Sequence, residues 1–162
     1  MSSAREVLQQ HAQRLRRFAY ALTGTISDAD DLTHDVIVKV LEKGLPELDD
    51  PIPWLLKMTK NLWIDQLRYR ELRKTDESDG SEEIASEHSA SLLQTLHTQR
   101  VLIALAGLSE KYRLALTLVA VEGMSYEETA RILDIPVGTV MSRVARAREH
   151  MISLFHTSEV DQ

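Results

Sequence analysis

The stretch from Ser125 to Met151 constrains the fold of this chain more than any other. Ser125 and Glu128 have the S-x-x-E spacing of a helix-capping box, and apolar and small residues then recur at the spacing of one helix face as far as Leu133. The turn 134–136, with the sequence DIP, ends this helix. Because proline is tolerated in a first helical turn, a second helix can begin at once. The stretch is therefore predicted to be a helix-turn-helix.

The second helix of this motif has two chemically different faces. The apolar face should pack on the first helix, whereas the opposite face is suited to lying against a DNA groove. A scaffolding hairpin with a solvated arginine face is the alternative that the motif alone leaves open. The packing face holds Val137, Val140, Val144, Ala147 and Met151, and the open face holds Gly138, Ser142, Ala145 and Arg146 with Thr139 and Arg143 at its edges.

The distribution of charge allows nucleic acid as a partner although the net charge is −6. Residues 71–92 hold seven acidic and two basic residues and so contribute −5 of that net charge. Outside this segment, bases cluster along 57–74 and along 143–148, which gives two separate footprints for phosphates. The acidity thus lies away from the residues that would contact DNA.

Composition excludes several other classes of protein. The chain has no cysteine, so disulfides, thiolate metal sites and thiol redox sensing are excluded. No apolar run has the ~18 residues that a membrane span needs, and the N-terminal sequence lacks the apolar core of a signal peptide. The six histidines are scattered, and no Walker loop or catalytic motif is present. We expect a cytoplasmic protein that is not an enzyme, inserts into no membrane and needs no metal or cofactor.

Two helices are predicted before residue 45. The first begins at Ser3, which with Glu6 repeats the capping box, and ends at Gly24. The second is expected to be capped by Ser27, with acids in its first turn, lysines in its last turn and Gly44 after it, an order that matches the helix dipole. Its exposed face should be an acidic stripe, which is expected to be an ordinary solvated face. A nuclease-like carboxylate cluster is the less favoured alternative, because the helix dipole already explains the acids of the first turn. The stripe comprises Asp28, Asp31, Asp35 and Glu42.

A third, long helix is predicted from Pro53 to beyond Leu67, with apolar residues on several sides and hence a central position. Its basic side chains are expected to share one side with nearby aromatic rings, a mixture that binds the nucleic-acid backbone and unstacked bases. Trp54 is expected to be a core residue instead. The residues of the basic side are Lys57, Lys60 and Arg68, with Trp63 and Tyr69 nearby.

Residues 75–91 are acidic, serine-rich and nearly free of large apolar side chains, so they cannot offset the entropy of ordering. They are predicted to be a flexible linker. The fold class is thus all-α, with two small helical domains at 1–74 and 92–162 joined by the linker 75–91, and the second domain contains the helix-turn-helix.

We expect proteases to cut the free protein first within residues 75–91, because neither domain core depends on that segment. Two protected fragments should result, and mass spectrometry of a limited digest identifies them. Uniform resistance across the segment would instead mean that the two domains are packed together.

Two separated stretches resemble regions two and four of an extracytoplasmic-function (ECF, group IV) RNA polymerase sigma factor. They are DADDLTHDVIVKVL…PWLLKMTKNLWIDQLRYR and LSEKYRLALTLVAVEGMSYEETARILDIPVGTVMSRVARARE. The resemblance implies a promoter-specificity subunit that acts with core RNA polymerase through the β′ clamp helices and the β flap. It also implies promoter DNA as a partner, and an anti-sigma protein that controls the factor.

The resemblance assigns residues to three sites. The polymerase-binding helix corresponds to Asp31, Leu32, His34, Asp35 and Lys39, with His34 in place of the family's common glutamine. The N-L-x-x-D-x-x-R signature of the minus-ten helix corresponds to Asn61, Asp65 and Arg68, beside the candidate contacts Lys57, Lys60 and Trp63. The minus-thirty-five recognition helix corresponds to Thr139, Ser142, Arg143 and Arg146. In the family the loop at 45–53 captures a flipped minus-ten base.

Two other functions are consistent with parts of the sequence. A sigma-like decoy would bind an anti-sigma protein without supporting transcription, which leaves both basic footprints without a role. A stand-alone helix-turn-helix repressor would leave the acidic helix and residues 54–70 unexplained. Dependence of promoter binding on core polymerase separates a sigma factor from a repressor.

Overall fold

The computed structural model describes residues 3–74 and 92–160, and every regular element in these ranges is a helix. The predicted linker at 75–91 lies outside the described residues. Among the helices of the described ranges, none combines the length and apolar character that crossing a bilayer requires. In chain order the elements are α1 (Ala4–Thr23), α2 (Ile26–Lys43), α3 (Ile52–Lys74), α4 (Leu92–Ala106), α5 (Glu110–Leu116), η1 (Thr117–Val121), α6 (Tyr126–Leu133) and α7 (Val137–Val160).

The first helix begins and ends as its sequence predicts. The Glu6 N–H donates to the Ser3 hydroxyl at 3.2 Å, and the Ser3 N–H donates back to the Glu6 carboxylate at 3.4 Å, which completes the capping box. At the other end Gly24 has φ 85° and donates its N–H to the carbonyl of Tyr20. Only glycine adopts this left-handed conformation without strain, so α1 stops here and the chain turns back along it.

The predicted cap of the second helix is wrong by two residues. Thr25, not Ser27, is the N-cap, and its hydroxyl accepts the N–H of Asp28 at 3.1 Å. A capping hydroxyl must precede the N–H that it accepts by two or three residues, so Thr25 reaches Asp28 while Ser27 already lies inside the first turn. The predicted end is confirmed, because Gly44 follows Lys43 with φ 84°.

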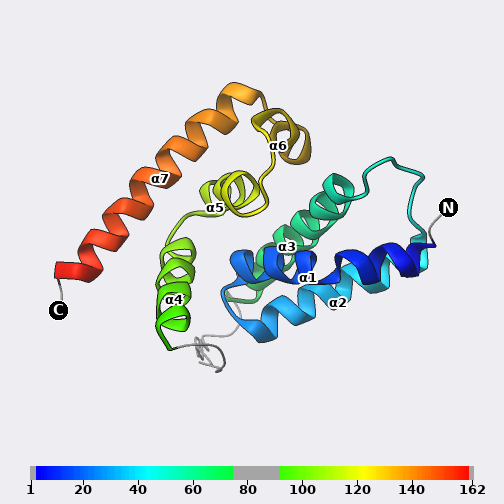
Figure 1. Ribbon diagram of the computed structural model, residues 1–162, viewed down its shortest axis with the longest axis horizontal. Helices are drawn as coiled ribbons and strands as arrows, with labels where there is room; N and C mark the ends of the chain where they lie inside the picture. The colour runs from blue at the N-terminus through cyan, green and yellow to red at the C-terminus, as the bar shows by residue number, and fades with distance from the viewer. Residues whose placement is uncertain (1–2, 75–91, 161–162) are drawn as a thin grey trace.

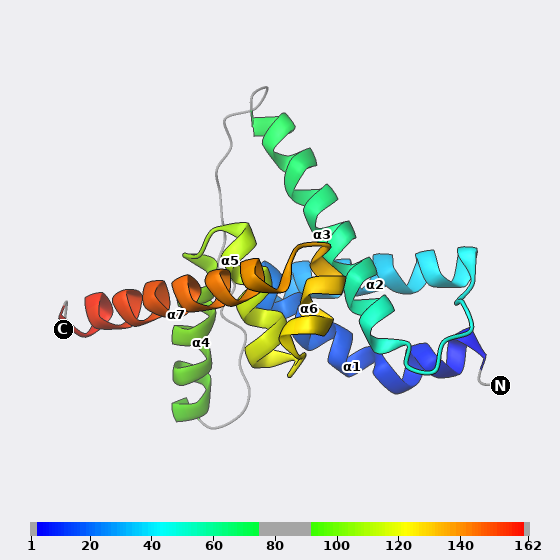
Figure 2. The ribbon, with the colours of Figure 1, turned by 90° about the horizontal axis from the view of Figure 1, so that it is seen from above.

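Helices α1, α2 and α3 form the N-terminal unit. Figure 1 shows α1 and α2 lying side by side with α3 behind them. Phe18 and Leu22 of α1, Leu32 and Val36 of α2 and Leu55 of α3 are fully buried in their common core. The C-terminal part of α3 projects away from the rest of the molecule (Figure 2), and residues 68–74 are exposed along it.

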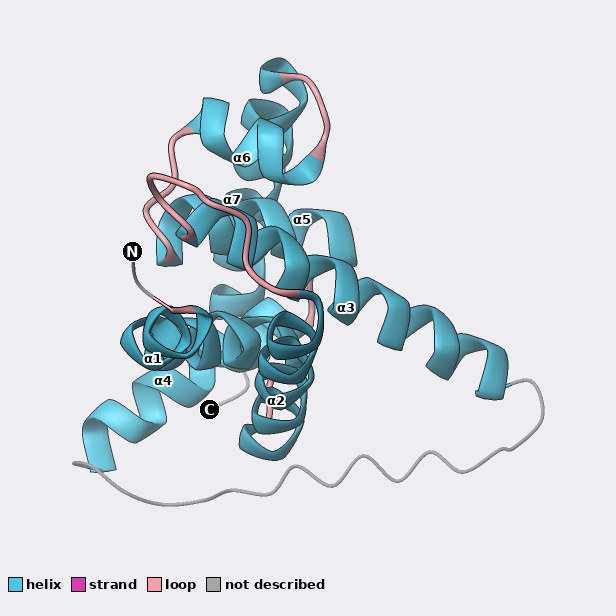
Figure 3. Ribbon diagram, turned by 90° about the vertical axis from the view of Figure 1, so that its right-hand side faces the viewer, coloured by secondary structure: helices cyan, strands magenta, loops and turns pink. Residues whose placement is uncertain are grey.

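The C-terminal unit contains the predicted helix-turn-helix in α6 and α7. Ser125 caps α6 by accepting the Glu128 N–H at 3.0 Å, and Asp134 ends the helix with φ 57°. Val140 and Val144 of α7 are buried, which confirms the predicted packing face. Figure 3 shows α6 above α1 and α2, with α5 between these levels.

One apolar core continues from the N-terminal unit into the C-terminal unit. The buried cluster that contains Phe18 and Leu55 also contains Leu118 of η1, Met124 from the turn before α6, and Ile132 of α6. The sequence pattern predicts two domains but does not predict this contact between them. The two units therefore pack directly on each other across α1 and α3.

Candidate functional site

The outer face of α2 exposes most of the residues assigned to it. Asp31, His34 and Asp35 are exposed and Lys39 is half-buried. Leu32, by contrast, is fully buried in the core, as expected for a residue one position along a helix from Asp31. Leu32 therefore holds α2 against α1 and α3, and its polar neighbours form the exposed face of the helix.

The acidic stripe of α2 is tied to α3 by two polar contacts. Gln66 donates its side-chain amide to Asp35 at 3.1 Å, and Arg70 lies 3.4 Å from the carboxylate of Asp28. Both contacts are exposed, so each adds little stability. The common apolar core sets the orientation of α3 relative to α2, and these two contacts lie at its exposed margin.

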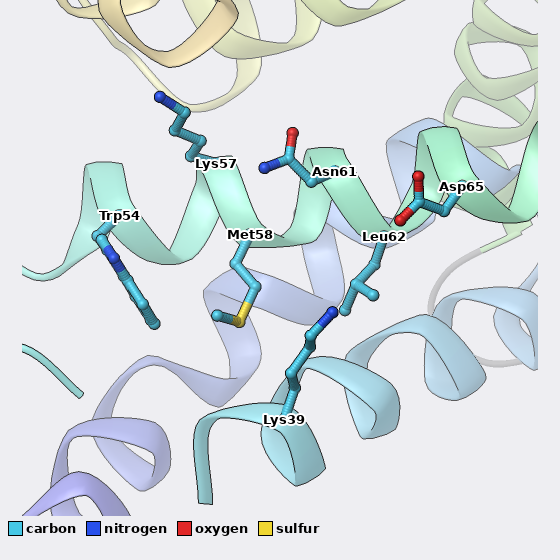
Figure 4. A pocket seen from close by; sticks show the side chains of 7 residues that line it. All are labelled: Lys39, Trp54, Lys57, Met58, Asn61, Leu62 and Asp65. Carbon is cyan, nitrogen blue, oxygen red and sulfur yellow. The ribbon is translucent and has the colours of Figure 1, made fainter. Parts of the chain in front are cut away.

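Four assigned residues of α3 form one exposed stripe. Lys57, Asn61, Asp65 and Arg68 recur every three or four residues, and all four are exposed. In Figure 4 Lys57, Asn61 and Asp65 leave α3 on one side, whereas Trp54, Met58 and Leu62 leave it on the side toward α2. Together with Lys39 of α2, these side chains line a groove of about 360 Å³.

The other two assigned residues of α3 are not on this stripe. Lys60 is 9% exposed and Trp63 is 3% exposed, so the expectation that bases and aromatic rings share one exposed side is wrong. Both residues face the C-terminal unit, and the Arg113 guanidinium lies 5.6 Å from the Trp63 ring centroid. Burial lowers the pKa of Lys60, and the nearby Lys57 lowers it further while Asp134 partly compensates.

The expectation that Trp54 is a core residue holds only in part, because its half-buried ring packs against the edge of the core. Trp54 is only half-buried and lines the groove, while Trp63 is the tryptophan of the core. Both rings follow the apolar periodicity of α3, so the pattern by itself cannot rank them. The C-terminal unit covers the Trp63 side of α3 and leaves the Trp54 side open.

The recognition face of α7 is open to solvent. Ser142 and Arg146 are exposed, and Thr139 and Arg143 lie half-buried at its edges, as predicted. Arg146 donates a hydrogen bond to the Tyr112 hydroxyl of α5, and this bond lowers the pKa of Tyr112 and raises that of Arg146. The Tyr112 ring in turn meets the His150 ring edge-on at 5.3 Å. Arg146 of the open face is thus oriented by a contact with α5.

Sequence reasoning missed the charged groups at the contact between the two units. Glu122 follows η1, and its side chain has no exposure. It binds Arg14 and Arg17 of α1, and the half-buried side chain of Arg113 reaches α1 as well. In the sequence Glu122 is an acid at the end of an apolar run, and no spacing relates it to arginines about a hundred residues earlier.

Comparison with known proteins covers both units. The family model "Sigma-70 region 2" matches residues 7–73, and "Sigma-70, region 4" matches residues 98–151. The ECF RNA polymerase sigma factor SigE of Mycolicibacterium smegmatis is 31% identical over the whole chain, which spans 66% of that longer protein. The ECF RNA polymerase sigma factor EcfG of Rhodopseudomonas palustris is 32% identical over 95% of this chain and 86% of its own length.

A solved structure shares the arrangement of both units. The sigma factor RpoE of Bartonella quintana, in a co-crystal with the anti-sigma factor NepR, is 30% identical with a TM-score of 0.80 over 94% of this chain and 96% of its own. The match therefore extends from α1 to α7. With regions two and four in order and relatives matched along nearly the whole chain, this protein belongs to the ECF sigma factors, the non-enzymatic subunits that direct RNA polymerase to specific promoters.

Proposed function

We propose that this sigma factor has three binding surfaces, each on one helix face. The face of α2 binds core polymerase, that of α3 binds the minus-ten element and that of α7 binds the minus-thirty-five element. The observation that supports this division is exposure. Each of the three faces is at the surface, and the opposite face of each helix lies in the core.

The acidic face of α2 fits a basic partner. Asp31 and Asp35 lie one helical turn apart and both are exposed, so a partner helix bearing cations can meet both at once. We assign this face to the β′ clamp helices of core polymerase. Polymerase is found in the cytoplasm, and we propose that this chain acts there.

The stripe of α3 fits melted promoter DNA. Lys57 and Arg68 supply cations for phosphates, and Asn61 can pair with the edge of an unstacked base. The adjoining groove, with the half-buried ring of Trp54, can stack such a base. The loop at 45–53 directly precedes Trp54, which lines this groove. We assign the loop to the capture of a flipped base.

The open face of α7 fits a major groove. Arg146 offers the bidentate donor that guanine accepts, and Ser142 and Thr139 offer hydroxyls to either bases or phosphates. The same unit is assigned to the β flap of polymerase. Because the relative RpoE was solved with the anti-sigma factor NepR, we also propose that an anti-sigma protein binds this chain.

Run-off transcription with purified core polymerase and a library of genomic promoters tests the proposed function. A sigma factor yields promoter-specific transcripts only when core polymerase and this chain are both present. Promoter binding by the chain alone would indicate a repressor, and holoenzyme formation without transcripts would indicate a decoy.

Lys57→Ala should weaken binding of the holoenzyme to all promoters alike. Lys57 contacts phosphates rather than base edges in this assignment, so its loss should also flatten the plot of log affinity against log salt by about one unit. Binding measured at several salt concentrations checks this. Lys43→Ala removes an exposed lysine from the end of α2 and serves as the control; an equal change in both variants would contradict the assignment.

A further inference from the structure

A buried carboxylate joins the two units of this chain. The Glu122 Oε2 atom accepts the Arg14 Nε–H at 2.8 Å and a terminal N–H of Arg17 at 3.1 Å. The second arm of Arg14 donates to the Glu122 backbone carbonyl at 2.9 Å. The Glu122 side chain has no exposure, although Arg14 and Arg17 remain 32% and 57% exposed. We call these three residues the Glu122 latch.

The latch is specific to the packed arrangement of the two units. A buried carboxylate is tolerated only when cations and hydrogen bonds replace the water that it loses. Here both cations come from α1, whereas Glu122 belongs to the other unit. Separation of the units would return Glu122 to water and leave two arginines on the surface of α1. The latch therefore exists only in the closed form.

A second arginine contact strengthens the closed form. Arg113 of α5 donates to the carbonyl of Leu22, in the last turn of α1, at 2.7 Å. The last carbonyls of a helix have no partner within it, so this arginine caps α1 from the opposite unit. Its guanidinium also lies over the Trp63 ring of α3 at 5.6 Å. One side chain thus fixes the C-terminal unit against two helices of the N-terminal unit.

Apolar side chains fill the space between the charged contacts. Met124 and Ile132 of the C-terminal unit are buried in the cluster that contains Trp63. Charged contacts specify one geometry, while this apolar surface supplies most of the attraction. The contact resembles a core more than a solvated domain surface.

Closure covers part of the α3 surface assigned to DNA. Trp63 is 3% exposed and Lys60 is 9% exposed, and Lys60 has Asp134 of the helix-turn-helix as a neighbouring charge. Lys57, only three residues before Lys60, stays exposed. The boundary of the covered surface therefore runs along α3 between these two lysines.

We propose that the Glu122 latch is an autoinhibitory contact, which holds the free sigma factor closed and withholds Lys60 and Trp63 from DNA until the two units separate. This inference rests on the proposed minus-ten role of α3. The closed form needs no second protein, because every group of the latch is supplied by this chain. The similarity in arrangement to RpoE co-crystallised with NepR fits a closed form that an anti-sigma protein can bind and prolong.

Lysine acylation of the free, full-length chain tests closure directly. An N-hydroxysuccinimide ester modifies exposed amines, and mass spectrometry of peptides gives the rate at each lysine. Lys57 is the internal reference, since it lies on the same helix and is exposed. A lowered pKa increases the fraction of Lys60 in the reactive neutral form, so a slow rate at Lys60 reports restricted access rather than protonation. We expect Lys60 to react much more slowly than Lys57 in the wild type.

Two variants open the latch from opposite sides. Glu122→Lys places a third cation beside Arg14 and Arg17, and Arg14→Ala with Arg17→Ala removes both cations without touching the C-terminal unit. Each should raise the Lys60 rate about tenfold or more and leave the Lys57 rate unchanged, because losing a buried charged hydrogen bond shifts a two-state equilibrium by at least that factor. Arg16→Ala is the matched control, since Arg16 pairs with Asp30 at 2.7 Å within the N-terminal unit.

The outcomes separate closure from the role in DNA binding. A wild-type Lys60 that reacts as fast as Lys57 would overturn the proposal, as would a Lys60 that stays protected in both opened variants with helical content preserved by circular dichroism. The opened variants should also bind a randomised single-stranded oligonucleotide about tenfold tighter than the wild type at low salt; equal affinity would overturn the inhibitory role. Lys60→Ala in the holoenzyme tests the minus-ten assignment separately, through run-off transcription.

Discussion

Asp31→Lys combined with Asp35→Lys should abolish binding of this sigma factor to core polymerase. Both carboxylates are exposed on α2 and face outward from the core. Replacing them places cations against a surface that we propose to be basic, and each like-charge contact costs several kcal/mol. Since 1.4 kcal/mol corresponds to a tenfold change, the affinity should fall by about a hundredfold or more.

The fold should survive this double substitution. Asp31 lies beyond the first turn of α2, which begins at Ile26, so the helix dipole loses little. Co-purification with core polymerase measures the effect, with circular dichroism as a check on folding. Glu71→Lys with Glu149→Lys makes the same change in net charge at two exposed sites on other helices. Equal retention of core polymerase by the two double variants would remove α2 from the polymerase interface.

Arg146→Ala should relax the sequence preference of the holoenzyme at one or two minus-thirty-five positions. A bidentate arginine contact to a guanine contributes about 1 to 3 kcal/mol of discrimination, so binding to the best promoter should fall by that amount. Promoters that already lack the contacted base should bind almost as before. In the free chain Arg146 donates a hydrogen bond to Tyr112, which it exchanges for the guanine when it binds DNA.

Binding of the holoenzyme to a set of single-base promoter variants measures this preference. Arg148→Ala is the control, because Arg148 is an exposed arginine of α7 that lies two residues along and on another side of the helix. It should weaken all variants equally or not at all. An unchanged base preference in Arg146→Ala would show that the recognition face lies elsewhere on α7.

Local interactions of the sequence determined the helices and the family. Capping at Ser3, the left-handed glycines at 24 and 44 and the apolar face of α7 depend on residues within a few positions of one another. Such patterns can be read without any long-range contact. The match of both motifs to regions two and four gave the function for the same reason, since each motif lies within a continuous stretch.

The tertiary structure alone decided which side of α3 is open. Apolar and basic residues surround this helix, so its periodicity leaves the covered side undetermined, and Trp54 and Trp63 are equivalent in the pattern. The C-terminal unit covers the side of α3 that carries Trp63, because Met124 and Ile132 pack there. The side that carries Trp54 stays open. Glu122 meets Arg14 across 108 positions of sequence, a pairing that no local spacing encodes. Burial of that carboxylate depends on the whole fold. For this reason the sequence predicted which helix faces are exposed, but not the contact that covers part of α3.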